Sequence, residues 1–232
     1  VIVGGGAAGH AAAETLRSEG YAGPVTLLSA DAALPCDRPN LSKNYLAGTA
    51  PAEWLPLRPR TFYQQRDIDL RLNTRVERID VAKQQLELQG GACVAYGALL
   101  LATGAEPVHL SMPGADLPHV HYLRTQADGE ALAAAAQGAQ RAVVIGASFI
   151  GLEVAASLRT RGIAVQVVGR ETRLLEKVLG AQVGEHLQAL HEKHGVVFHL
   201  GTDPARIDAK GVGLGNGKTL PADLVVVGIG VR

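Results

Sequence analysis

The chain is poor in aromatic residues and carries no excess of charge of either sign. Its 232 residues include 3 Phe, 5 Tyr and 1 Trp, and 22 Lys+Arg are matched by 22 Asp+Glu. Balanced charge provides no basic face for nucleic acid and no attraction to an acidic membrane. No apolar run approaches the roughly 20 residues that a membrane-spanning helix needs. We therefore expect neither a nucleic-acid partner nor a membrane-embedded segment.

Cysteine is equally scarce. Cys36 and Cys93 form neither a CxxC pair nor a closely spaced pair, so no disulfide framework is predicted and a reducing cytoplasm fits best. Cys93 lies among alternating apolar residues and is predicted to pack. Of the histidines, only His191 and His194 share a predicted helix face, and no cysteine accompanies them. No metal site is predicted.

Glycine, by contrast, is abundant, with 28 residues in a composition that is 47% apolar and 19% charged. Such a composition is typical of an α/β protein with many strand–helix turns. Two glycine-rich turns each follow an apolar strand and open a helix whose N-terminus can face a pyrophosphate. They run Val1-Ile2-Val3-Gly4-Gly5-Gly6-Ala7-Ala8-Gly9 and Ala142-Val143-Val144-Ile145-Gly146-Ala147-Ser148-Phe149-Ile150-Gly151. Two such turns predict two dinucleotides, and hence electron transfer between cofactors.

The pattern around each turn predicts a βαβ unit. The fold class is therefore α/β, with two tandem Rossmann-like dinucleotide-binding domains in three layers and β-meander insertions. We predict a first domain over residues 1–112 and a second over 113–232, near a linker marked by prolines. The polar, proline-bearing stretch from Asp31 to Pro59 is predicted to be an irregular loop that carries function.

Four further segments occur in order between and after the turns. They are Asp37-Arg38-Pro39-Asn40-Leu41-Ser42-Lys43, Leu101-Ala102-Thr103-Gly104-Ala105-Glu106-Pro107, Phe149-Ile150-Gly151-Leu152-Glu153-Val154-Ala155 and the terminal run Ala222–Arg232. Over the whole chain, this set resembles the FAD-dependent pyridine nucleotide-disulfide oxidoreductase family, in the branch of ferredoxin reductases and apoptosis-inducing-factor-like proteins. The segments 35–39 and 146–149 are similar to members that carry a Rieske domain.

The resemblance implies cofactor contacts for FAD and for NADH or NADPH. For FAD, the implied residues are Gly4, Gly6, Ala8, Gly9, Asp31, Arg38, Lys43, Val76, Thr103 and Gly104. For the nicotinamide dinucleotide, they are Gly146, Ser148, Phe149, Ile150, Gly151, Arg170 and Gly228. It also implies a catalytic pair, Lys43 and Glu153. An ammonium beside the flavin favours its reduced form, and a carboxylate keeps that ammonium charged.

The residues depart from the family pattern at both ribose-binding positions. The position after the second strand of the first unit, where the family pattern has an acid, holds Ala30, and the neighbouring Asp31 could substitute for that acid. In the second unit the corresponding position is Gly169, followed by Arg170 and Glu171. An arginine there suits the 2′-phosphate of NADPH, whereas an acid suits NADH. The choice of nucleotide stays open on the sequence.

We expect hydride transfer from NAD(P)H to FAD and onward electron transfer to an iron–sulfur acceptor, either a ferredoxin or a Rieske domain fused upstream. Two alternatives remain: a single-cysteine disulfide reductase or NAD(P)H oxidase that uses Cys36, and a redox-responsive NAD(P)H-binding interaction protein. Against the family pattern, the chain is expected to be a fragment that lacks a C-terminal flavin-covering segment. The sequence predicts no oligomeric state.

Overall fold

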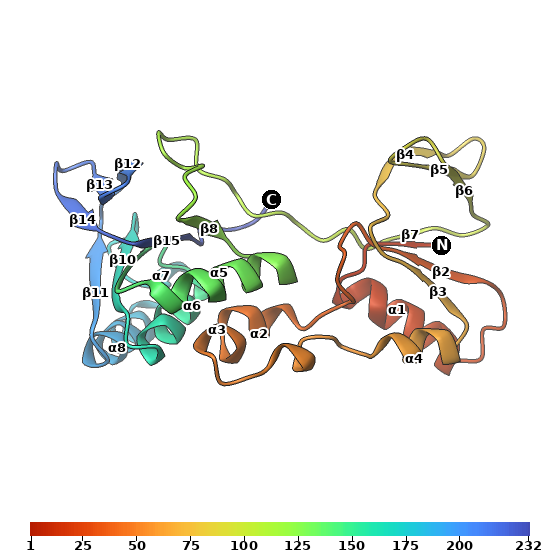
Figure 1. The fold of residues 1–232 in the computed structure, drawn as a ribbon, viewed down its shortest axis with the longest axis horizontal. Helices are drawn as coiled ribbons and strands as arrows, with labels where there is room; N and C mark the ends of the chain where they lie inside the picture. The colour runs from red at the N-terminus through yellow and green to blue at the C-terminus, as the bar shows by residue number, and fades with distance from the viewer. The chain divides into compact units, whose positions relative to one another are not determined.

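A computed structural model describes all residues from Val1 to Arg232, and the chain divides into two compact units (Figure 1). The first unit comprises Val1–Asp37 and Glu53–Ala105, and the second comprises Arg38–Ala52 and Glu106–Arg232. The compact units therefore differ from a single division at residue 112, because residues 38–52 pack with the second unit. The assignment of FAD to one unit and NAD(P) to the other stays a prediction.

The first unit contains a four-stranded parallel sheet in the order β3-β2-β1-β7. Helices lie on one face of it and a three-stranded antiparallel meander, β4-β5-β6, on the other. Its elements are β1 (Ile2–Val3), α1 (Ala7–Ser18), β2 (Val25–Leu28), α4 (Arg60–Gln65), β3 (Ile68–Arg71), β4 (Val76–Asp80), β5 (Gln85–Leu88), β6 (Cys93–Ala95) and β7 (Leu100–Leu101).

Alternating strand residues build the three layers of this unit. In β1, Ile2 packs in the cluster formed with α1 and α4, whereas Val3 packs with Leu86 of the meander. In β2, Leu27 and Leu28 divide between the same two clusters. Successive side chains of a strand point to opposite faces, so an unbroken apolar strand predicts a sheet that is covered on both sides.

The second unit repeats this plan around a five-stranded parallel sheet in the order β11-β10-β9-β15-β8. Within β9, Val144 packs on the helical side, whereas Val143 and Ile145 pack against a second meander, β12-β13-β14. Its elements are α2 (Arg38–Ser42), α3 (Asn44–Ala47), β8 (Val120–Tyr122), α5 (Gln126–Gly138), β9 (Arg141–Ile145), α6 (Phe149–Thr160), β10 (Ala164–Gly169), α7 (Glu176–Leu179), α8 (Ala181–Lys193), β11 (Val196–Leu200), β12 (Pro204–Asp208), β13 (Gly211–Leu214), β14 (Thr219–Pro221) and β15 (Leu224–Val227). The predicted fold class is confirmed.

The stretch from Asp31 to Pro59 is more ordered than the sequence predicts. It holds α2, α3 and a 3₁₀ turn at Ala52–Trp54, and Leu41, Leu46 and Leu55 in it are fully buried. The prediction of an irregular loop was wrong, because helical segments this short leave no periodic apolar pattern.

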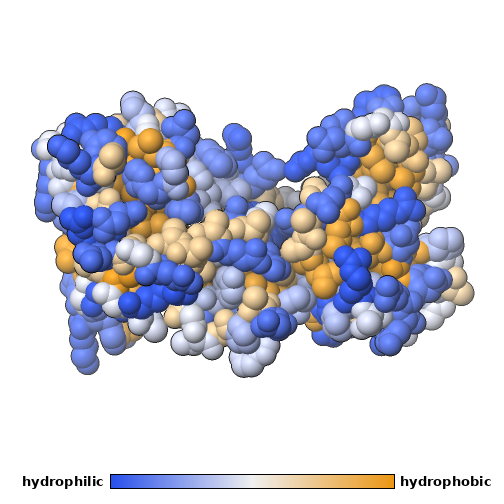
Figure 2. All heavy atoms as spheres, viewed as in Figure 1, coloured by the Kyte–Doolittle hydropathy of each residue, from blue (hydrophilic) through white to orange (hydrophobic).

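The two cysteines are free, with Cys36 buried and Cys93 exposed. The predicted packing of Cys93 was wrong because β6 turns Val94, not Cys93, toward the meander's core. Hydrophilic residues predominate on the face drawn in Figure 2, with smaller apolar patches on each unit. No helix combines the length and the apolar character needed to cross a bilayer.

Candidate functional site

The two glycine turns obey the same steric constraint at their last glycine. A Cβ on Gly9 would lie 2.0 Å from the carbonyl oxygen of Gly4, and a Cβ on Gly151 would lie 2.0 Å from that of Gly146. Real Cβ atoms do not approach an oxygen this closely, so any side chain would push the helix away from the strand. Close strand–helix packing therefore requires glycine at both positions.

The first glycine of each turn is constrained by a neighbouring strand end. Gly4 has φ +119° and Gly146 has φ +111°, a region that favours glycine. A Cβ on Gly4 would lie 2.1 Å from the Ala102 carbonyl oxygen, and one on Gly146 would lie 2.3 Å from that of Gly228. Each turn is thus paired with the end of a parallel strand, and Thr103-Gly104 directly follows that contact in the first unit.

The helices that leave the two turns begin differently. No side chain caps the N-terminus of α1, where Gly6 is the N-cap residue. At α6, Ser148 Oγ accepts a hydrogen bond of 3.1 Å from the Gly151 N–H and donates one of 2.7 Å to the Gly228 carbonyl oxygen. The first N–H groups of a helix have no intrahelical acceptor, so the α1 terminus fits a pyrophosphate oxygen in place of a cap. At α6 one such donor is already used.

Lys43 and Glu153 form the predicted ion pair. Lys43 Nζ lies 2.9 Å from Glu153 Oε1, with the lysine side chain 48% exposed and the glutamate side chain 30% exposed. Ser42 Oγ donates a 2.6 Å hydrogen bond to the other carboxylate oxygen, Oε2. Glu153 therefore has a partner for each oxygen, and the Lys43 side chain stays about half exposed.

Helix α6 holds the segment that carries Lys43 through a stripe of polar residues. Glu153 is followed at four-residue intervals by Ser157 and Arg161, which share its helix face. Ser157 Oγ donates a 2.7 Å hydrogen bond to the carbonyl oxygen of Ser42, and Arg161 Nε donates to that of Leu46. The sequence analysis missed Ser157 and Arg161, although their spacing from Glu153 was a usable signal.

The remaining predicted residues are distributed over both units. Asp31 follows β2, and its N–H donates a 3.2 Å hydrogen bond to Ser29 Oγ. Val76 begins β4, whereas Arg38 begins α2. Arg170 follows β10 and pairs with Asp203. At the start of α6, Phe149 and Ile150 are exposed.

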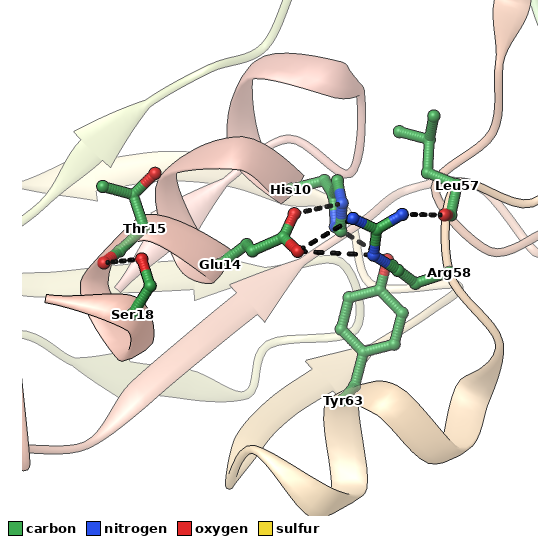
Figure 3. A network of polar contacts seen from close by, with 7 residues as sticks. All are labelled: His10, Glu14, Thr15, Ser18, Leu57, Arg58 and Tyr63. Carbon is green, nitrogen blue, oxygen red and sulfur yellow. Dashed lines mark hydrogen bonds and ion pairs between the residues drawn. The ribbon is translucent and has the colours of Figure 1, made fainter. Parts of the chain in front are cut away.

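A buried polar network adjoins the first glycine turn (Figure 3). His10, which follows Gly9, lies 3.0 Å through Nδ1 from the hydroxyl of Tyr63 and 3.2 Å through Nε2 from Glu14. A carboxylate only accepts, so Nε2 carries the proton and Nδ1 accepts from the tyrosine. Arg58 pairs with Glu14 at 3.0 Å. The network ties α1 to α4, and no sequence motif signalled it.

Burial sets the ionisation of this network. It lowers the pKa of His10 although Glu14 opposes the shift, so the imidazole is held neutral. It also raises the pKa of the Tyr63 hydroxyl to about 12. Both groups are therefore uncharged near neutral pH, which suits their place in the core beside the turn.

A hollow of about 380 Å³ lies in the second unit beside β8. Among its lining residues, His121 has a buried Nε2 without a hydrogen-bond partner. Burial lowers the pKa of this imidazole, and His119 adds to the shift. The sequence carries no signal for the hollow because its lining residues come from separate segments, the linker, β8 and the start of α5. No group of three His, Cys, Asp or Glu side chains is arranged to hold a metal ion.

The doubled glycine turn on two parallel sheets defines a protein built to bind two dinucleotides. The family model for pyridine nucleotide-disulphide oxidoreductases matches residues 1–232, and the chain belongs to this family.

Several relatives of known name match the chain from end to end. It is 42% identical to rhodocoxin reductase of Rhodococcus erythropolis, over 100% of this chain and 55% of that protein. It is 37% identical to apoptosis-inducing factor 3 of Homo sapiens, over 99% of this chain and 38% of that protein. The chain thus spans about half the length of the curated reductases it matches.

Solved structures agree with the sequence relatives. The ferredoxin reductase for the CYP199A2 system from Rhodopseudomonas palustris matches with a TM-score of 0.95 and 40% identity, over 99% of this chain and 58% of that one. Putidaredoxin reductase in its covalent complex with putidaredoxin matches with a TM-score of 0.95 and 36% identity, over the same shares. The chain therefore has the fold of a little more than half of each of these reductase chains.

Proposed function

We propose that this chain supplies the FAD- and NAD(P)H-binding part of a flavin reductase. Hydride passes from NAD(P)H to FAD, and electrons pass on to an iron–sulfur protein, either a ferredoxin or a Rieske domain. The observation that carries the proposal is the duplicated glycine turn, with the same steric constraint at Gly9 and Gly151. Relatives named as ferredoxin reductases support it. The scarcity of cysteine favours a reducing cytoplasm.

The first unit offers the groups that would hold FAD. The uncapped N-terminus of α1, with Gly6 as its N-cap residue, provides N–H donors for the pyrophosphate. Asp31 provides a carboxylate for the ribose, and Thr103-Gly104 lie beside the turn. When bound, FAD supplies the chemistry, since it takes two electrons together and releases them singly.

Lys43 and Glu153 are the residues that we assign to the hydride step. The Lys43 ammonium provides a positive charge that favours the developing negative charge of a reduced flavin. Glu153, fixed by Ser42 through its second oxygen, orients that ammonium. The second glycine turn, with Ser148 and Gly151, would position the nicotinamide nucleotide.

Anaerobic reduction of bound flavin tests the proposal. The purified chain is saturated with FAD, freed of excess cofactor, and mixed with NADH or with NADPH under nitrogen. We expect loss of the flavin absorbance with at least one nucleotide. Subsequent addition of an oxidised ferredoxin should restore that absorbance as the iron–sulfur cluster is reduced.

Two results would contradict the proposal in different ways. Bound FAD that neither nucleotide reduces would remove the hydride step. Reduction that is slow, followed by a long-lived flavin–nucleotide complex that ferredoxin does not discharge, would favour the redox-responsive binding protein instead. The Cys36→Ser variant serves as the control for a thiol reaction, and we expect it to keep full reductase activity.

A further inference from the structure

The second strand of each unit, β2 in the first and β10 in the second, ends with the same pattern of backbone hydrogen bonds. In the first unit, the Gly4 N–H donates a 2.8 Å hydrogen bond to the carbonyl oxygen of Leu28, the last residue of β2. In the second unit, the Gly146 N–H donates a 2.8 Å hydrogen bond to that of Val168 in β10. Leu28 and Val168 therefore occupy corresponding positions, which sets the alignment of the residues that follow them.

The next residue continues the correspondence. Ser29 accepts a hydrogen bond of 2.7 Å at its carbonyl oxygen from the Thr74 N–H, and Gly169 accepts one of 3.2 Å from the Thr202 N–H. Both Ser29 and Gly169 are buried. Each loop is thus fastened to the chain segment just after the neighbouring parallel strand.

Two residues further on, each loop reaches an acid. The carbonyl oxygen of Asp31 accepts a 2.9 Å hydrogen bond from the Asn73 N–H, and that of Glu171 accepts a 3.0 Å hydrogen bond from the Gly201 N–H. Glu171 is therefore the backbone counterpart of Asp31. Gly169 corresponds to Ser29 and not to Ala30, so the acid of each unit follows that buried residue by two positions.

The side chain of Glu171 returns toward the vacant position. A Cβ built on Gly169 would lie 3.3 Å from Glu171 Oε2 and 2.9 Å from the Cβ of Ala147, within the second glycine turn. The carboxylate thus lies beside the position that a side chain on residue 169 would occupy, and glycine at 169 avoids a clash with Ala147 there.

The charged side chains that follow β10 differ in whether they already have an ion-pair partner. Arg170 is paired with Asp203, and Arg173 is paired with Glu176 at 2.9 Å. The Glu171 carboxylate has no hydrogen bond and no ion pair. Both cations thus have an acidic partner, and the carboxylate is the group without one.

We propose that Glu171 accepts a hydrogen bond from the adenosine ribose of the nicotinamide nucleotide and makes the second unit selective for NADH. The inference rests on the proposed function and settles the choice of nucleotide within it. A 2′-hydroxyl donates to the carboxylate, whereas the dianionic 2′-phosphate of NADPH is repelled by it. Asp203 competes with the 2′-phosphate for the Arg170 guanidinium, which weakens the attraction that Arg170 would otherwise provide.

Calorimetric titration with the oxidised nucleotides NAD⁺ and NADP⁺ tests the assignment without any turnover. We expect the unsubstituted chain to bind NAD⁺ at least tenfold more tightly. The Glu171→Gln variant should lose roughly 10- to 100-fold in NAD⁺ affinity, the cost of a charged hydrogen bond, and should bind NADP⁺ more tightly than before. The Asp203→Asn variant should gain NADP⁺ affinity by freeing Arg170.

Glu130→Gln is the matched control, because it removes an equal charge from α5, and it should leave both affinities unchanged. An NAD⁺-to-NADP⁺ affinity ratio that Glu171→Gln alters less than about twofold would overturn the assignment. Tighter binding of NADP⁺ by the unsubstituted chain would overturn it as well. In either case the proposed function stands, whereas failure of both nucleotides to bind removes the two together.

Discussion

Ser42 donates a 2.6 Å hydrogen bond from its Oγ to Oε2 of Glu153, a residue 111 positions further along the chain. The neighbouring Lys43 binds the other oxygen of the same carboxylate at 2.9 Å. Two consecutive residues of the 38–52 segment therefore fix one acid from both sides. The geometry of the ion pair depends on the serine as well as on the lysine.

The Ser42→Ala variant tests this dependence. Ser42 is 3% exposed, so its removal leaves a carboxylate oxygen of Glu153 without its partner. We expect a loss of about 1–3 kcal/mol in the free energy of unfolding, measured by urea titration, and slower flavin reduction. Ser18→Ala is the control, since the Ser18 hydroxyl contacts only an exposed carbonyl oxygen. Equal stability of the two variants would contradict the structural role.

Lys43→Gln should weaken flavin reduction without unfolding the protein. The change removes the positive charge beside the proposed flavin site while keeping a side chain of similar length. We expect stopped-flow reduction by NADH to slow on the order of 100-fold, and the midpoint potential of the bound flavin to fall. Lys83→Gln, at an exposed ion pair with Asp80, should alter neither quantity. An unchanged flavin potential in Lys43→Gln would remove the lysine from the hydride step.

Gly9→Ala should damage the first glycine turn, because its Cβ would meet the Gly4 carbonyl oxygen at 2.0 Å. We expect a loss of at least about 2 kcal/mol in stability together with weaker FAD binding, measured by flavin fluorescence. Gly138→Ala should have the opposite effect on stability. Gly138 ends α5 with open space around it, so alanine there should raise stability by up to about 1 kcal/mol.

Tyr63 should make stability depend on pH in the alkaline range. Its pKa is raised to about 12, so the folded state favours the neutral phenol. This contribution is complete below the ordinary tyrosine pKa of about 10 and is lost as the pH rises through 12. The Tyr63→Phe variant lacks the hydrogen bond to His10 and should be about 1 kcal/mol less stable near neutral pH. That deficit should shrink above about pH 10, and a constant deficit across urea titrations would contradict the linkage.

The sequence predicted the elements that are long or that follow a turn motif. Apolar strands and glycine turns leave signals within a few consecutive residues, and each turn lies between a strand and a helix as predicted, β1 and α1 in the first unit and β9 and α6 in the second. The Lys43–Glu153 pair was also predicted, although only through a family resemblance.

Contacts between residues that are far apart in the sequence could not be predicted from it. The burial of Leu46 requires contact with helix α6, and the His10–Tyr63 hydrogen bond joins residues 53 positions apart. The sequence shows that Glu171 is an acid after β10, but its return toward Gly169 depends on a loop conformation set by Gly201 and Thr202. Local patterns specify elements, whereas these contacts follow from the tertiary arrangement.

The contacts of α6 with residues 38–52 make this early segment part of the core of the second unit. Leu46 is fully buried in the core cluster of the second unit, and Arg161 binds its carbonyl oxygen. A piece beginning at Glu106 would therefore keep every strand of the second sheet and yet lose part of its own core. Residues 38–52 must therefore accompany the later residues for the core of the second unit to be complete, so the two units are interleaved in the sequence.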